Sequence, residues 1–200
     1  MTNSDAAHHV RFLFDPICPW AYQASLWIRE VAKVRPLNIE WGLLSLEFIN
    51  RDTKDDEYLT PLRQNRRTIR LLEHARQVGG NQALDDLYLA IGEARHEQNR
   101  SLTDQKMLEK ALASAGLPIS LLEATRTNQE IDEQLEHAYA QATSQGAFGV
   151  PTLFLNDGQT PFYGPLIEIV PTGEEAGQLW DHTSALISMP YFYELKRGRS

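Results

Sequence analysis

The sequence predicts a mixed α/β fold in which a long helical segment interrupts the strands. Residues 10–16 have the pattern of a short buried strand, residues 18–35 that of an amphipathic helix, and residues 38–46 that of a second strand. From about 55 to 146 the apolar spacing is helical almost throughout, and strand-like sequence returns at 150–156. This order predicts an α/β unit divided by a helical insertion.

The first three elements have recognisable boundaries. The strand "VRFLFDP" ends at Pro16, and Pro19 occupies the first helical turn, where a missing N–H costs nothing. Pro36 ends the helix before "NIEWGLLSL" begins the second strand. The apolar stripe of this helix is broad and predicts a buried face: Ala24, Leu26, Trp27, Ile28, Val31 and Val34.

Turn and capping residues divide the helical segment into several helices. Thr60-Pro61 has the pattern of a helix start, and "VGGNQ" at 78–82 has that of a break. A further helix begins near Thr103 and ends at "AGLP" (115–118), where glycine and proline follow its last turn. Thr127 and Glu130 have the spacing of a capping box for the last helix of the segment.

The chain returns to the α/β unit near residue 147. "VPTLFLN" (150–156) predicts a strand, and "DGQ" (157–159) predicts a hairpin turn that leads into "TPFYG". Thr172 and Glu175 predict the start of a final helix over 173–187. We therefore expect one α/β domain from residues 1–50 and 147–200, with residues 51–146 as a helical insertion domain.

Composition and charge exclude several classes of partner. The 200 residues carry a net charge of −8 with an isoelectric point near 5.2, which disfavours binding to nucleic acids and anionic membranes. No apolar run approaches the ~20 residues needed to span a bilayer, and the first ten residues lack the features of a secretory signal. A single cysteine rules out an internal disulfide and favours a reducing compartment, so we expect a cytoplasmic protein.

That cysteine, Cys18, lies where the first strand gives way to a helix. The unpaired N–H groups and the positive end of the helix dipole stabilise a thiolate there, so the position alone predicts a lowered pKa and a reactive nucleophile. The alternative, a small buried apolar residue, is as common for a lone cysteine.

Several stretches resemble a known family. The opening "FDPICPWAYQASLWIREVAKVR" and the later "GVPTLFLNDGQTPFYGP" resemble the DsbA-like branch of the thioredoxin superfamily, which carries a helical insertion. With "LYLAIGEARHEQN", "PTGEEAGQLWD" and "YFYELKR", they resemble most closely the actinobacterial mycothiol-dependent nitroreductase group. The chain departs from that group at Ala21, because its close members have Cys-Pro-Trp-Cys where this chain has Cys-Pro-Trp-Ala.

The resemblance implies a thioredoxin-like fold and a set of site residues. Cys18 would be the attacking thiolate, facing a cis peptide bond at Val150-Pro151, and Pro19 and Trp20 would line the cleft. Three residues would contact substrate from the insertion or its margin: Asn50, Tyr58 and His96. These candidates also have plain structural alternatives. Trp20 would pack in the core, His96 would face solvent on a helix, and Asn50 and Tyr58 would be ordinary loop residues. Asp15, which precedes the motif, either tunes the thiol or caps the turn.

Other site chemistries find little support in the sequence. Adjacent His8 and His9 point in different directions on an extended chain, so we expect no metal site. The sequence contains neither the G-x-G-x-x-G pattern of dinucleotide sites nor the G-x-S-x-G elbow of hydrolases. The first inserted helix carries Arg63, Arg66, Arg67 and Arg70, a pattern typical of a solvated helix face that would also suit a ligand carboxylate.

Ala21 removes the second thiol that would resolve a mixed disulfide within the chain. We therefore expect a monothiol oxidoreductase with no tightly bound cofactor, which uses mycothiol or glutathione to reduce mixed disulfides or electrophilic acceptors. Three alternatives stay open. Ala21 replaces a cysteine in an altered chain, the protein is an isomerase of the kappa-class glutathione transferase kind, or it is a binding module that retained the fold. Monomer and homodimer are both compatible with the sequence.

Overall fold

The computed structural model describes residues 7–156, 158 and 160–198, and it has the mixed architecture that the sequence predicts. The four strands in chain order are β1 (His8–Phe14), β2 (Leu37–Leu43), β3 (Thr152–Leu155) and β4 (Phe162–Tyr163). The helices are α1 (Pro19–Val34), α2 (Leu46–Asn50), α3 (Asp56–Gln64), α4 (Arg66–Gly92), the π-helix η1 (Glu93–Glu97), α5 (Gln105–Ser114), α6 (Leu121–Ala124), α7 (Gln129–Ser144) and α8 (Gly173–Ile187).

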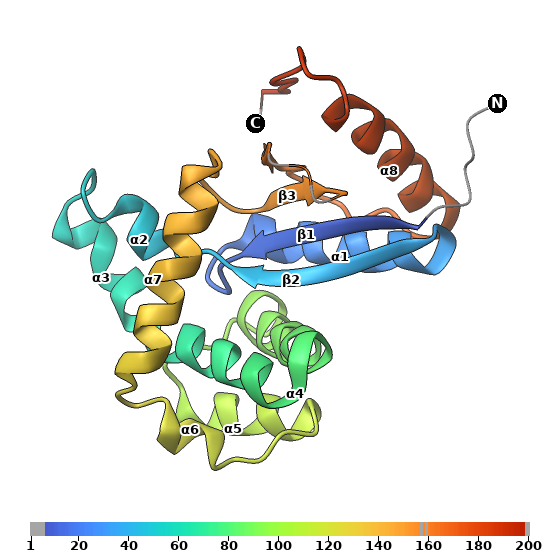
Figure 1. The fold of residues 1–200 in the computed structure, drawn as a ribbon. Coiled ribbons are helices and arrows are strands. Elements are labelled where there is room, and N and C mark those ends of the chain that lie inside the picture. The colour runs from blue at the N-terminus through green and yellow to red at the C-terminus, as the bar shows by residue number, and fades with distance from the viewer. Residues whose placement is uncertain (1–6, 157, 159, 199–200) are drawn as a thin grey trace.

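The strands form one mixed sheet in the order β2-β1-β3-β4 (Figure 1). β1 and β2 are parallel and joined by α1, whereas β1 with β3 and β3 with β4 are antiparallel. At the middle of the sheet Phe12 pairs with Trp41 on one side and Leu153 on the other. The parallel pair joined by a helix confirms the strand–helix–strand unit predicted for the first 46 residues.

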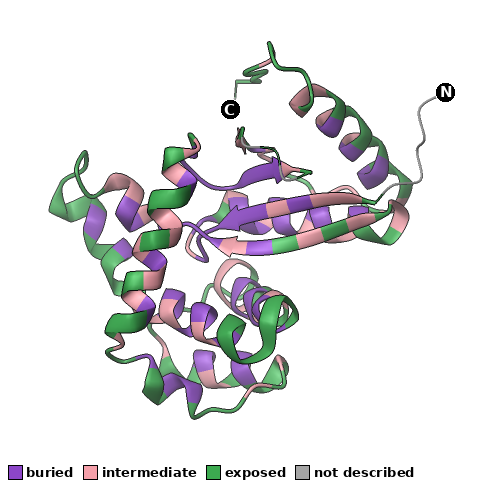
Figure 2. Cartoon of the chain, viewed as in Figure 1, coloured by how far each residue is buried: buried purple, intermediate pink, exposed green. Residues whose placement is uncertain are grey.

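Two helices far apart in the sequence, α1 and α8, pack against each other beside the sheet (Figure 1). The apolar stripe predicted for α1 is buried, and Trp27 lies 6.1 Å from Trp180 between ring centroids. The Trp27 indole N–H donates to the carbonyl oxygen of Ala176 at 3.2 Å. Purple residues along the facing sides of the sheet and helices show where this core lies (Figure 2).

The helices between β2 and β3 lie below and beside the sheet in Figure 1. The break predicted at 78–82 is instead a kink inside α4, at Gly80, whose φ of 70° is easily accessible only to glycine. The next residue, Asn81, accepts from the Trp41 N–H at 2.7 Å and donates to the Ile39 carbonyl at 2.8 Å. The kink thus brings an amide side chain onto the free edge of β2, where it pairs with the backbone like a short strand.

Two predicted helix starts are wrong by a few residues. α3 begins at Asp56 because the Asp55 carboxylate accepts from the Tyr58 N–H, so Pro61 lies inside the helix. α7 is capped by the side chain of Asn128, which accepts from the Ile131 N–H, and not by the predicted Thr127 box. The final helix has the predicted bounds. The division into two domains stays a prediction, and the predicted turn at 157–159 lies partly outside the described residues.

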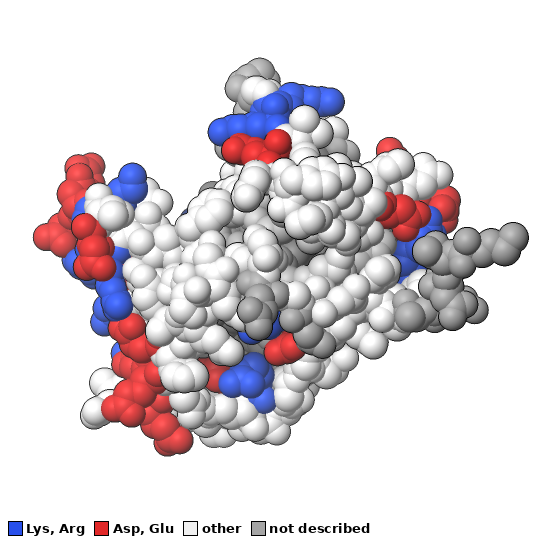
Figure 3. Space-filling model, turned by 45° about the horizontal axis from the view of Figure 1, so that its top comes forward, with Lys and Arg blue, Asp and Glu red and all other residues white. Residues whose placement is uncertain are grey.

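The basic face predicted on the first inserted helix consists mainly of ion pairs. Arg66 pairs with the buried carboxylate of Glu47, and Arg70 with Asp132 at 2.6 Å. These partners come from α2 and α7, so the two arginines link α4 to other helices, and the largely buried Arg70 differs from the solvated face that the sequence favoured. On the face drawn in Figure 3, charged side chains gather at the margins around a broad uncharged area. No helix in the described part of the chain is long and apolar enough to cross a membrane.

Candidate active site

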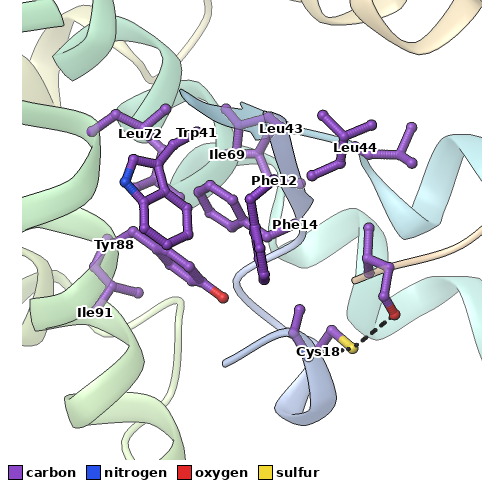
Figure 4. Packing of buried hydrophobic residues seen from close by; sticks show 14 of the residues in the cluster. Phe12, Phe14, Cys18, Trp41, Leu43, Leu44, Ile69, Leu72, Tyr88 and Ile91 are labelled. Carbon is purple, nitrogen blue, oxygen red and sulfur yellow. Dashed lines mark hydrogen bonds between the residues drawn. The ribbon is translucent and has the colours of Figure 1, made fainter. Parts of the chain in front are cut away.

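Cys18 caps the N-terminus of α1 and lies at the margin of the aromatic core (Figure 4). Its sulfur accepts from the Ala21 N–H at 3.4 Å, and its thiol donates to the carbonyl oxygen of Val150 at 3.6 Å. Only 7% of its surface is exposed. The thiol therefore joins two segments that are 132 residues apart in the sequence, the start of α1 and the loop before β3.

The prediction that the helix terminus lowers the pKa of Cys18 is wrong. Burial raises the pKa of the thiol, because a thiolate loses most of its hydration in this position. The N–H groups of Ala21 and Trp20 lower the pKa by less, and the negative charge of Asp15 raises it further. The resting protein therefore holds a protonated thiol at neutral pH, in agreement with its hydrogen bond to Val150.

This protonation state predicts slow alkylation of Cys18 in the native protein. At pH 7.5 we expect iodoacetamide to react several-fold more slowly with the folded chain than with the same chain in urea, because the thiolate is the nucleophile. The folded rate should still rise with pH at pH 9, above the ordinary range of a cysteine. If the alkylation rate instead reached its plateau below pH 7, the helix terminus would lower the pKa of Cys18 more than burial raises it. Intact mass after timed quenching measures both rates on the single thiol.

Asp15 anchors the loop that carries Cys18. Its fully buried carboxylate accepts from the N–H of Ile17 at 3.0 Å, the N–H of Leu46 at 2.8 Å and the side-chain amide of Asn65 at 2.9 Å. Burial raises the pKa of Asp15 to about 6, against the opposing effect of the three donors. The capping role considered from the sequence is thus observed, and it extends to the starts of α2 and α4.

His96 lies against the other side of the same loop. It belongs to the π-helix η1, a rare element that is frequent at functional sites, and its Nε2–H donates to the Pro16 carbonyl at 3.0 Å. Its ring stacks on Tyr22 of α1 at 5.0 Å. Burial lowers the pKa of His96, so the ring is neutral at pH 7. His96 is therefore half-buried against the loop and not solvent-facing, and its contact with substrate stays a prediction.

Gly92 provides the room that this arrangement needs. A Cβ at this position would lie 2.4 Å from two ring carbons of Tyr22, so only glycine lets the ring pack flat against α4. We expect Gly92→Ala to displace Tyr22 and to release His96, which stacks on it. The loss of the His96 contact should appear as a His96 imidazole pKa nearer its ordinary value in an NMR titration. An unchanged titration would show that the ring moves without disturbing the histidine.

The peptide bond between Val150 and Pro151 is cis, as the resemblance implies. The loop then enters β3, and the Pro151 carbonyl accepts from the N–H of Gly164 at 2.8 Å. A second cis bond, Gly164–Pro165, adjoins this contact and was not predicted. The Cys18 thiol and the cis-proline loop therefore face each other, with the Val150 carbonyl between them.

The other predicted site residues differ in how they relate to the thiol. Pro19 is exposed beside Cys18, and Trp20 is half-buried against the core. Asn50 and Tyr58 make contacts within their own part of the chain. The Asn50 amide donates to the Leu46 carbonyl, and the half-exposed ring of Tyr58 lies 5.6 Å from Lys54 Nζ. Their roles in substrate binding stay predictions.

No group of three or more His, Cys, Asp or Glu residues that would suit a metal ion occurs among the residues that the structure describes.

A cavity of about 590 Å³ lies between α7, α4 and the β2 edge, and Cys18 is not among its lining residues. The candidate site is therefore the region around the thiol and not this cavity. Sequence reasoning missed Tyr22, Gly92 and two aromatic residues beside the cis-proline loop, Phe148 and Tyr163.

The family model for Rv2466c-like proteins, described as mycothiol-dependent nitroreductase Rv2466c, matches residues 17–197. The chain belongs to this family. This membership confirms the resemblance stated from the motifs and makes the chain an oxidoreductase of the DsbA-like thioredoxin superfamily. A relative from Mycobacterium tuberculosis, the uncharacterized protein Rv2286c, is 32% identical over 192 residues, which is 96% of this chain and 82% of the relative.

Solved structures show the same fold at low sequence identity. A 2-hydroxychromene-2-carboxylate isomerase is similar with a TM-score of 0.66 at 18% identity, over 88% of this chain and 93% of the isomerase. The probable DsbA oxidoreductase SCO1869 from Streptomyces coelicolor is similar with a TM-score of 0.62 at 15% identity, over 96% and 94% of the two chains. At such identities these likenesses establish the fold alone.

Proposed function

We propose that this protein is a monothiol oxidoreductase that transfers a sulfur-bound group between its one cysteine and a small external thiol, which the family description suggests is mycothiol. One observation carries the proposal. The only thiol of the chain begins α1 opposite a cis-proline loop, and position 21, one helical turn further on, holds a methyl group. A mixed disulfide on Cys18 therefore has no partner inside the chain.

The reaction has two exchange steps. The Cys18 thiol first loses its proton to solvent, and the thiolate attacks one sulfur of a mixed disulfide. The S–S bond breaks, Cys18 forms a new disulfide with the attacked sulfur, and the other half leaves as a thiolate that takes up a proton. An external thiol then attacks the adduct and regenerates the Cys18 thiol, with release of a symmetric or mixed disulfide. The net result is thiol–disulfide exchange: one half of the first disulfide is released as a free thiol, and the other half leaves in a disulfide with the external thiol.

The geometry supports this sequence of steps. An extended substrate that pairs with the cis-proline loop would bring its sulfur to Cys18, as in strand addition. The Ala21 and Trp20 N–H groups face the sulfur and would stabilise the thiolate once a substrate displaces the Val150 hydrogen bond. Pro19 and Trp20 would border the bound group. A reducing compartment, most simply the cytoplasm, would supply the external thiol.

One observation favours a second candidate, a noncovalent isomerase of the kappa-class kind. The thiol is buried and protonated in the resting state, so it is suited to donate a hydrogen bond to the sulfur of a bound thiol. Such enzymes commonly carry serine at this position, and a cysteine there is a point against the candidate. A binding module without chemistry is the third reading. Neither alternative forms a covalent adduct on Cys18.

The proposal is tested by intact mass after incubation with oxidised mycothiol and, separately, oxidised glutathione. We expect a single adduct with the mass of one thiol, formed faster with mycothiol and removed by excess reduced mycothiol. Cys18→Ser should show no adduct. A wild-type chain that stays unmodified by both disulfides at pH 8.5 would exclude covalent catalysis and favour the noncovalent candidates.

A further inference from the structure

Two exposed aromatic rings flank the loop that faces the thiol. Phe148 lies two residues before Val150 and is 68% exposed, and Tyr163 of β4 is 38% exposed. Their ring centroids are 5.2 Å apart and tilted by 31°. Val150 accepts the hydrogen bond from Cys18, and Tyr163 pairs with Thr152 two residues further on, so the pair adjoins the loop that faces the thiol. We call Phe148, Gly149 and Tyr163 the aromatic ledge.

Gly149 allows the ledge to form. A Cβ on this residue would lie 2.9 Å from Cε2 and 3.2 Å from Cδ2 of Tyr163, so any side chain would push the ring away. The backbone pairing of Thr152 with Tyr163 fixes the ring at this position along β3. The ledge thus combines two residues of the loop before β3 with one residue of β4, the strand that pairs with β3.

The two chain segments that form the ledge contain no charged residues. Residues 146–155 and 160–167 contain no Lys, Arg, Asp or Glu. A solvent-exposed ring beside a reactive group gains most from a flat, neutral ligand that stacks on it, because ring–ring contacts add to the gain from burial alone.

We propose that the aromatic ledge is a specificity-determining surface that binds an aromatic ring carried by the disulfide that Cys18 attacks. The inference rests on the proposed function, since it concerns the group that Cys18 attacks. The ring stacks on Phe148 and places its sulfur toward the thiol. Phe148 and Tyr163 select the substrate in this arrangement and take no part in bond making.

Two disulfides that differ in this one property test the proposal. 2,2′-Dithiodipyridine is aromatic and neutral, and 2-hydroxyethyl disulfide is aliphatic and neutral. With each, Cys18 forms a mixed disulfide and one thiol is released. For Phe148→Ala we expect the second-order rate constant for modification of Cys18 by the aromatic probe to fall about 3- to 10-fold, with less than a 2-fold change for the aliphatic probe.

Three further variants control this comparison. Phe148→Tyr should keep the wild-type ratio of the two rates, and Gly149→Ala should reduce it by displacing Tyr163 without removing a ring. Ile169→Ala, which removes an 85% exposed apolar side chain from another loop, should leave the ratio unchanged. An equal fall for both probes with Phe148→Ala, or no fall for either, would overturn the role of the ledge.

A binding measurement separates this proposal from the proposed function. In an NMR titration of Cys18→Ser with 2,2′-dithiodipyridine, no reaction is possible, and we expect saturable shifts of the Gly149 and Tyr163 amides. The double variant Cys18→Ser/Phe148→Ala should bind about 3- to 10-fold more weakly. Equal affinities would overturn the ledge even if Cys18 proves reactive. Normal binding with an inert wild-type thiol would overturn only the covalent mechanism.

Discussion

Asp15→Ala is expected to lower the free energy of unfolding by about 2–4 kcal/mol at pH 7.5. The substitution leaves three N–H donors without their acceptor at the join between β1, α2 and α4: Ile17 N–H, Leu46 N–H and the Asn65 amide. Each unsatisfied buried donor costs about 1–3 kcal/mol, partly offset here because a buried carboxylate is also removed. Urea unfolding followed by tryptophan fluorescence measures the loss.

The matched control is Asp55→Ala. Asp55 also accepts a backbone N–H, that of Tyr58, but it is an exposed cap of α3. Its loss should cost about 1 kcal/mol, as for other helix caps. If both variants cost the same, the three buried bonds of Asp15 add nothing beyond an ordinary cap.

The cost of Asp15→Ala should also depend on pH in a defined direction. Burial raises the pKa of Asp15 from 3.8 to about 6, so between these values the folded protein retains a proton that the unfolded chain releases. The stability from this proton is complete below pH 3.8 and is lost as the pH rises through 6. The gap between wild type and Asp15→Ala should therefore be wider at pH 4.5 than at pH 7.5. If the stability difference between wild type and Asp15→Ala were instead larger at pH 7.5, the three donors would lower the pKa of Asp15 more than burial raises it.

The sequence predicted the parts of this fold that depend on local signals. The bounds of α8 match the prediction, with two glutamates in the first turn and an apolar stripe that includes Trp180, although its N-cap residue Thr172 makes no side-chain capping hydrogen bond. The break at "VGGNQ" became a kink because a glycine with positive φ suits both outcomes, and only the contact of Asn81 with β2 decides between them. Local sequence contains no record of that contact.

The candidate site shows the same limit. The motif around Cys18 predicted its place at a helix terminus, and the two N–H groups near the sulfur follow from that place. Its raised pKa could not be predicted, because burial by residues such as Val150 depends on a segment 132 residues away. Only the family resemblance made His96 a candidate site residue. Its contact with the Pro16 carbonyl depends on a π-helix that no local sequence pattern indicates. Phe148 directly precedes "GVPT", so its position beside the cis-proline loop could have been predicted from the sequence.

Ala21→Cys is expected to change the chemistry of the site from monothiol to dithiol. Position 21 is buried in the first turn of α1, and its N–H already lies 3.4 Å from the Cys18 sulfur. Residues three apart on a helix are close enough for a disulfide between their side chains. Under mild oxidation we therefore expect a loss of 2 Da in intact mass and no thiol that reacts with iodoacetamide after denaturation.

The same variant should lose the external adduct that we propose for the wild type. A neighbouring thiol attacks a mixed disulfide at an effective concentration far above that of any added thiol, so the adduct with mycothiol or glutathione should fall below detection within the dead time of mixing. Ala24→Cys, also buried on α1 but six residues from Cys18, is the matched control and should keep the stable adduct. If Ala21→Cys keeps two free thiols under oxidation and a stable adduct, side chain 21 does not face Cys18. The absence of a resolving thiol would then not explain why the wild type depends on an external one.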